Sequence, residues 1–237
     1  MFKMRNRMAK IFLYLYFLKT KNMKKILTLI ICIISLQTFS QSFYKGALVA
    51  NLNYGFDVYR VRYHTALKNN AGVSKDTTDG AASSGPSLGI EYGVTKWLGI
   101  GVCGKYDTYF TSKDKYTGIR PSVNGGELGL IVNFHIVRTN IFNLVAGVDA
   151  GYSHLIYRTN DVVGTEVYGS GSWFNIHLTP RFYFGRFGIC STINIPFINY
   201  PNMTTSNATL NQTFISAWHA SGFGMTFGIQ YRFLKAK

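Results

Sequence analysis

The sequence predicts an all-β fold, an eight-stranded antiparallel up-and-down transmembrane β-barrel that follows a cleaved signal peptide. Three observations support this prediction. Large apolar residues alternate with small or polar ones in eight segments, the links between those segments are alternately short and long, and a short apolar run follows two lysines near the start. Strict alternation places one kind of side chain on each face of a β-strand.

The first element is a leader. Met23, Lys24 and Lys25 precede the apolar run Ile26–Leu36, which is followed by QTFSQS. A basic start, an apolar core of about 7–15 residues and small residues before a cleavage site are typical of a secretory signal peptide. The alternative, a membrane anchor, needs about 20 apolar residues. We therefore predict a leader over 1–40, with Met23 as a possible true start, and a barrel domain over 41–237.

The composition excludes several classes of function. Of 237 residues, 16% are aromatic and only 15% charged, and eight of the 25 Lys and Arg residues lie within 1–40. The net charge of +15 therefore belongs largely to the leader, and no basic cluster interleaved with aromatic residues predicts nucleic-acid binding. Cys103 and Cys190 are distant, and no CxxC or HExxH motif is present. We expect no metal site, no cofactor and no nucleic-acid partner.

Eight strands follow the leader, each a run of seven to twelve residues in which large apolar side chains alternate with glycine or small polar ones. The alternation is least regular in the seventh run and clearest in the eighth. In chain order, the runs are Gly46–Phe56, Leu88–Val94, Leu98–Asp107, Glu127–His135, Phe142–Tyr152, Trp173–Phe184, Phe187–Ile195 and Gly224–Phe233. Pro180 lies inside the sixth run and requires a bulge or an unpaired backbone position there.

The residue types on the two faces favour a membrane barrel over a soluble, lipocalin-like one. The small face is rich in glycine with a few charges, which suits a narrow interior, whereas a solvated sheet face would carry many Lys, Glu and Thr residues. The large face carries almost no charge across the eight strands and suits lipid. Short links alternate strictly with long polar ones, as in barrels with short periplasmic turns and longer outward loops.

The closing strand GMTFGIQYRF carries a family resemblance. Its alternate apolar residues Phe227, Ile229, Tyr231 and Phe233 resemble the signal read by the barrel-assembly machinery. The chain from residue 41 to 237 resembles the small OmpA/OmpX-like eight-stranded transmembrane barrels of the Gram-negative cell envelope. This resemblance implies location in the outer membrane, with outer-membrane lipid, lipopolysaccharide and the assembly machinery as partners.

The charges on the small face are the first candidate site, which we interpret as a lumen charge network. Its members are Glu91, Lys105, Asp107, Glu127, Asp149, His177, Arg181 and Arg232, with His135 beside them. If Leu98 lies opposite Phe134, Lys105 lies opposite Glu127. If Phe134 lies opposite Phe142, Glu127 lies opposite Asp149. Three interpretations stay open: a salt-bridge network that fills the lumen, a narrow ion path, and acid–base catalysis.

A second candidate is the pair His219 and Ser221, which the alternation places on the lipid face near the outer end. The pair resembles the His-x-Ser motif of small-barrel lipid A deacylases, but no acidic residue follows to complete a triad. We expect a non-enzymatic outer-membrane protein with a structural or surface-recognition role. The largest outward loops, at 60–84 and 199–215, are the expected ligand contacts. The alternative is a narrow porin-like channel, and the third hypothesis is a lipid-modifying enzyme.

Overall fold

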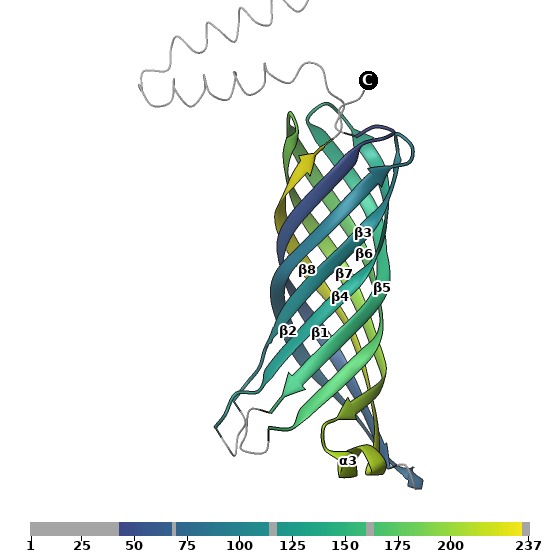
Figure 1. Cartoon of the computed structure of the whole chain (residues 1–237), viewed down its shortest axis with the longest axis vertical. Coiled ribbons are helices and arrows are strands. Elements are labelled where there is room, and N and C mark those ends of the chain that lie inside the picture. The colour runs from purple at the N-terminus through teal and green to yellow at the C-terminus, as the bar shows by residue number, and fades with distance from the viewer. Residues whose placement is uncertain (1–42, 68–69, 114–117, 160–163, 234–237) are drawn as a thin grey trace, which may run out of the picture. The chain divides into compact units, whose positions relative to one another are not determined.

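The computed structural model describes residues 43–67, 70–113, 118–159 and 164–233, and these form one closed barrel (Figure 1). Each strand pairs antiparallel with its neighbour in sequence, and β1 pairs with β8 to close the ring. The predicted eight-stranded up-and-down fold is confirmed. The elements are β1 (Leu48–Leu67), β2 (Asn70–Gly93), β3 (Leu98–Phe110), β4 (Ser122–Arg138), β5 (Phe142–Arg158), β6 (Glu166–Phe184), β7 (Phe187–Thr205), α3 (Ala208–Thr213) and β8 (Phe214–Arg232).

The predicted leader over 1–40, including Met23, lies outside the described residues. The described part of the chain holds no helix that is both long and apolar enough to cross a membrane.

The two faces of the strands point as the alternation indicates. On β4, Leu130 is 66% exposed on the outside of the barrel, whereas its neighbour Ile131 is 6% exposed and points inward. The same contrast recurs on every strand, so the outer wall carries an apolar belt. Aromatic pairs border this belt at the end with the short links, where Trp97 stacks on Phe134 and Phe187 contacts Tyr231. The belt is the surface that faces lipid.

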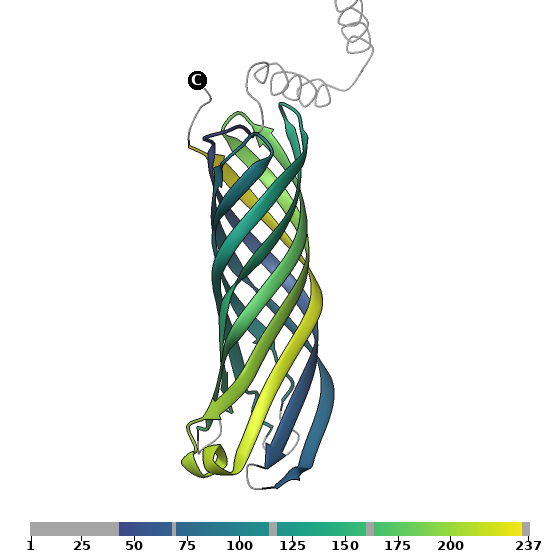
Figure 2. The same ribbon diagram turned by 90° about the vertical axis from the view of Figure 1, so that its right-hand side faces the viewer.

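The strands extend much further outward than the sequence predicts, and this corrects the two proposed loops. Residues 60–84 are mostly strand, since β1 runs to Leu67 and β2 begins at Asn70. Residues 199–215 are the end of β7, the short helix α3 and the start of β8. Figures 1 and 2 show both hairpins projecting from the end of the barrel opposite the short links and the end of β8. Outside lipid the polar strands need no apolar face, so backbone pairing continues where the alternation has ended.

Three prolines coincide with interruptions in the hydrogen-bonded ladders. The β6–β7 pairing skips Thr179 and Pro180, so the unpaired position that Pro180 requires is confirmed. The β2–β3 pairing likewise skips Gly85 and Pro86, and the β7–β8 pairing skips Ile195 and Pro196. The register is the same on both sides of each interruption. Proline lacks an N–H donor, which explains the missing pairs.

One predicted register is right and one is wrong. Leu98 lies opposite Phe134, and Lys105 lies opposite Glu127, as predicted. On the next pair of strands, however, Phe134 lies opposite Ala146 and Glu127 lies opposite Ser153. The predicted apposition of Glu127 and Asp149 is therefore wrong, because β5 is shifted by four residues and Asp149 lies opposite Ile131. A shift of the register by an even number of residues leaves every side chain on the same face of the sheet. The alternation of residue types therefore cannot distinguish the observed register from the predicted one.

Two glycines on β4 give a test of how tightly neighbouring strands approach. A Cβ atom on Gly129, which faces the interior, would lie 2.4 Å from the backbone oxygen of Ala150, whereas a Cβ on Gly126 would meet no atom within 4 Å. We expect Gly129→Val to destabilise the barrel by about 1–3 kcal/mol or more through overpacking, and Gly126→Val to be tolerated. The fraction of heat-resistant folded barrel on a gel measures both. Equal stability of the two variants would contradict the described close approach.

Candidate functional site in the barrel interior

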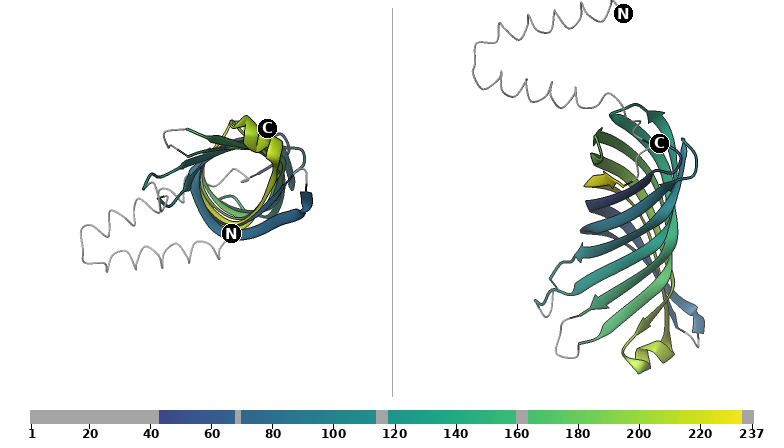
Figure 3. Two further views of the ribbon diagram at one scale, coloured as in Figure 1. Left: turned by 90° about the horizontal axis from the view of Figure 1, so that it is seen from below. Right: turned by 45° about the horizontal axis from the view of Figure 1, so that its top comes forward.

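The view along the barrel in Figure 3 shows the ring of strands that encloses the interior. At the short-link end lies a fully buried ion cluster. Glu91 accepts a hydrogen bond from Arg181 Nη1 (2.7 Å) and lies 2.8 Å from His135 Nε2. Asn143 Nδ2 donates to His135 Nδ1 (2.7 Å), so Nε2 is the ring nitrogen that donates to Glu91. Each buried charge is thereby paired, as burial in a membrane requires.

An aromatic seal closes the barrel just beyond this cluster. Phe43 is completely buried and stacks on His135, with ring centroids 3.4 Å apart. The guanidinium of Arg232 lies 5.5 Å from the ring centre of Tyr44 and 5.6 Å from that of Tyr183, and it donates to the Gly185 carbonyl (2.9 Å). We call Phe43, Tyr44 and Tyr183 the inner seal.

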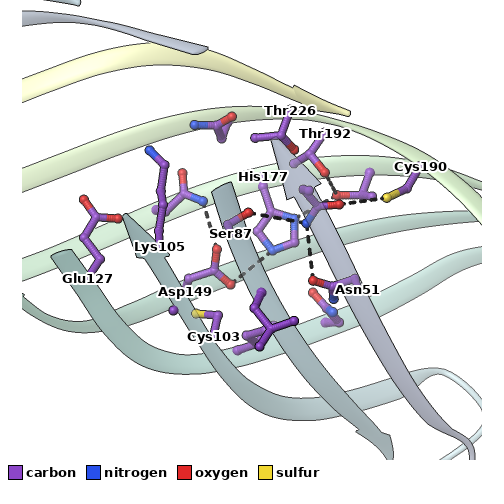
Figure 4. Close-up of a pocket in the computed structure, with 18 of the residues that line it drawn as sticks. Asn51, Ser87, Cys103, Lys105, Glu127, Asp149, His177, Cys190, Thr192 and Thr226 are labelled. Carbon is purple, nitrogen blue, oxygen red and sulfur yellow. Dashed lines mark hydrogen bonds and ion pairs between the residues drawn. The ribbon is translucent and has the colours of Figure 1, made fainter. Parts of the chain in front are cut away.

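A polar cavity of about 110 Å³ lies in the middle of the barrel (Figure 4). His177 Nε2 is 3.4 Å from Asp149 Oδ1, and Asn175 donates to the other oxygen of Asp149 at 2.9 Å. On the far wall, the Cys190 thiol donates to Asn53 (3.1 Å). Cys103 and Cys190 are both free thiols. A polar cavity of this size has room for several ordered water molecules.

Between the cavity and the outer end of the barrel lies an acidic cluster around one lysine. Lys105 is ion-paired with Asp57 and with Asp107 (2.7 Å), and Asn194 donates to Asp57 at 2.7 Å. Glu127, which lies directly opposite Lys105 on the ladder, has no ion pair or hydrogen bond with any described residue. In Figure 4 its carboxylate stands apart from the Lys105 ammonium at one side of the cavity. Glu127 is therefore the least compensated of these interior charges.

An apolar cluster fills the interior at the outer end. All of its members are at most 9% exposed. They are Tyr59, Val61, Val123, Leu155, Trp173, Ile198, Tyr200 and Met203. Within it, the hydroxyls of Ser153 and Tyr200 are hydrogen-bonded at 2.7 Å. We call this cluster the outer seal. The outer seal packs buried side chains into one end of the interior, and the inner seal packs them into the other.

A groove of about 460 Å³ on the outer wall approaches the same interior charges. It follows the β2–β3 seam where the ladder skips Gly85 and Pro86. Its lining includes the lipid-facing Leu88 and Leu128 together with the inward-pointing Lys105 and Glu127. The groove and the cavity share six lining residues: Ser87, Leu88, Cys103, Gly104, Lys105 and Glu127.

The structure divides the predicted charge network into separate groups. Glu91 and Arg181 are in contact, as are Lys105 and Asp107, and Asp149 and His177. Arg232 contacts the inner seal through Tyr44 and Tyr183, and Glu127 forms no ion pair with a residue of the described chain. The sequence analysis missed Asp57, because the first predicted strand ends at Phe56. Asp57 continues the alternation of Asn53 and Gly55, and this pattern indicates that it also points into the lumen.

The remaining predicted residues lie on the outer surface. Phe227, Ile229 and Phe233, three of the four residues of the predicted assembly signal, are exposed on the lipid face, and Tyr231 is half-buried against Phe233. His219 and Ser221 also point outward and are exposed, opposite Arg62 and Arg60 of β1. No described carboxylate forms a hydrogen bond with His219. Among the described residues, no group of three His, Cys, Asp or Glu side chains is placed to hold a metal ion.

One comparison with a solved structure supports the fold. The outer membrane protein OprG from Pseudomonas aeruginosa is similar, with a TM-score of 0.57 and 10% identity over 81% of this chain and 97% of that one. Weaker similarities include the outer membrane protein AlkL (TM-score 0.46, 17% identity, 84% and 96% covered). Another is Ail of Yersinia pestis (TM-score 0.39, 12% identity, 80% and 99% covered). No family model matches the sequence. No curated protein matches it either.

The apolar belt, the charged interior and the similarity to OprG together define the class. The chain is a small outer-membrane β-barrel protein, and its location is the outer membrane.

The ion cluster around Glu91 gives a test of how the interior is held together. We expect Glu91→Gln to lower the free energy of unfolding by about 3–5 kcal/mol, because it leaves the Arg181 charge buried without a partner. The double variant Glu91→Gln/Arg181→Met should lose less than the two single losses added together. Denaturant titration in detergent measures the cycle. Glu166→Gln, in an exposed pair with Arg158, is the control and should change little. Additive losses would contradict direct coupling of the pair.

Proposed function

We propose that this protein is a non-conducting outer-membrane barrel that acts through the long hairpins at its outer end. The observation that carries the proposal is the pair of seals, which fill both ends of the interior with buried side chains and leave only a small polar cavity of about 110 Å³ between them. An eight-stranded barrel has an interior that side chains can fill. The interior charges then serve stability, and the residues at 60–84 and 199–215 are the proposed contact surface for a ligand.

The geometry of the hairpins supports a surface role. The paired part of β1 and β2 continues past the apolar belt to residues 67 and 70, so it presents a two-stranded ribbon beyond the membrane. The connection from β7 to β8 carries α3, anchored by Asn211, whose side chain accepts a hydrogen bond from the Thr205 backbone N–H (2.7 Å). Rigid elements of this kind hold a binding surface in place at a lower entropic cost than a mobile loop.

The alternative is a narrow channel, and a specific observation favours it. Glu127 lines both the cavity and the groove on the outer wall, and it has no ion-pair partner among the described residues. A rearrangement near the β2–β3 seam would join the two spaces. The third hypothesis, lipid modification at His219 and Ser221, has less support, because no carboxylate orients the histidine in the described chain. We propose that the protein is not an enzyme.

Single-channel recording separates the first two proposals. We expect the purified barrel in a planar bilayer to show no steady openings, because both seals block water, and Glu127→Gln to be equally silent. The gel shift of folded protein confirms insertion-competent material in both samples. Steady openings whose size or selectivity changes in Glu127→Gln would overturn the non-conducting proposal and favour the channel.

Exposed lysines at the two ends test the proposed surface presentation. Lys75 and Lys113 are exposed at the hairpin end, and Lys45 and Lys96 are exposed at the short-link end. We expect a membrane-impermeant amine reagent on intact cells to label the first pair only, and to label all four after the outer membrane is permeabilised. Mass spectrometry of tryptic peptides measures the labelling. Labelling of Lys45 and Lys96 on intact cells would show that the short-link end faces the cell exterior, and would contradict the proposed exposure of the hairpins at the cell surface.

A further inference from the structure

A row of polar residues crosses four strands just outside the apolar belt. In this row Asn199 of β7 lies opposite His219 of β8, which lies opposite Arg62 of β1, which in turn lies opposite Thr78 of β2. All four are exposed. The neighbouring row nearer the belt contains Arg60 of β1, opposite Ser221 of β8. Side chains far apart in the sequence thus form one polar patch on the outer wall.

The patch lies at the level of lipid headgroups. The unbroken apolar run on the outer face of β1 ends at Val58, which lies opposite Phe223, where the corresponding run on β8 ends. Arg60 and Arg62 are the next two outward positions. Each step of two residues along a strand is about 7 Å, or about 5 Å along the membrane normal at the usual tilt. The guanidinium groups therefore extend over roughly the first 5–10 Å beyond the belt.

These two arginines differ from Arg158 and His64 at the outer end, because no described carboxylate pairs with them. Arg158 is neutralised by Glu166, with Nε 2.5 Å from the carboxylate oxygen, and His64 lies 2.6 Å from Asp76. The hydrogen bond from Tyr168, together with the charge of Arg158, lowers the pKa of Glu166, so this pair stays ionised. Arg60 and Arg62 carry no ion pair of this kind and point toward the lipid side.

We propose that Arg60 and Arg62, with His219 and Asn199 beside them, bind the phosphate groups of lipid A in the outer leaflet. Guanidinium groups bind phosphate through paired, charge-assisted hydrogen bonds, and they do so best where water is partly excluded. In an outer membrane, lipid A supplies phosphate groups at the level of the lipid headgroups, the level at which the polar patch follows the apolar belt. His219 and Ser221 then serve as polar contacts beside the arginines. This inference does not depend on whether the lumen conducts.

Native mass spectrometry of the full chain in mixed micelles, titrated with diphosphorylated lipid A, tests the proposal. We expect the wild type to bind lipid A, and Arg60→Gln/Arg62→Gln to bind it at least about tenfold more weakly, the loss that one charge-assisted hydrogen bond represents. Arg60→Lys/Arg62→Lys should keep part of the affinity. Arg158→Gln is the matched control, an exposed arginine at the same end that already has a carboxylate partner, and it should bind as the wild type does.

Two further samples identify the source of the affinity. Lipid A from which the phosphates have been removed should bind to the wild type as weakly as diphosphorylated lipid A binds to the double glutamine variant. Equal binding of the dephosphorylated lipid would show that the apolar belt alone accounts for the contact, and would overturn the proposal. Equal binding of phosphatidylglycerol through the same arginines would overturn the assignment to lipid A. If the double variant does not fold, the single variants Arg60→Gln and Arg62→Gln carry the comparison.

Discussion

The narrow interior of an eight-stranded barrel is the constraint on which the rest of this structure depends. Where the strands face lipid, their charged side chains must point into a narrow interior that is filled mostly by side chains. The interior must then satisfy those charges locally, as Arg181 and His135 do for Glu91, and Lys105 does for Asp57 and Asp107. Glycine is abundant on the same face because larger residues would collide with neighbouring backbone, as at Gly129. The narrow interior of the barrel thus accounts for both the glycines and the paired charges on the inner face of the strands.

The fold was predictable because alternation survives wherever one face of a strand meets lipid. The eight runs, the closure and the direction of the side chains needed no more than period-two patterning and the lengths of the links. The ends of the strands were not predictable in the same way. Beyond the belt both faces of the β1–β2 ribbon are solvated, so polar residues such as those of 70–80 leave no periodic signal even though they pair.

The site was less predictable than the fold, because it depends on register and on side-chain direction. Lys105 lies opposite Glu127 as expected, yet its ammonium turns to Asp57 and Asp107, and no sequence pattern specifies that choice. A four-residue shift of β5 separates Glu127 from Asp149 without moving any side chain to the wrong face. Phe43 escaped notice because it precedes the first periodic residue. The lumen was foreseen as charged, but its division into an ion cluster, a cavity and two seals was not.

The inner seal has a consequence for the order of assembly. Phe43 and Tyr44 stand at the beginning of the barrel domain, whereas Arg232 is the last residue of β8. Their contacts join the two ends of the barrel sequence and also reach His135 on β4. The contact between Tyr44 and Arg232 can form only when β8 lies beside β1, so this contact is present only in a closed ring.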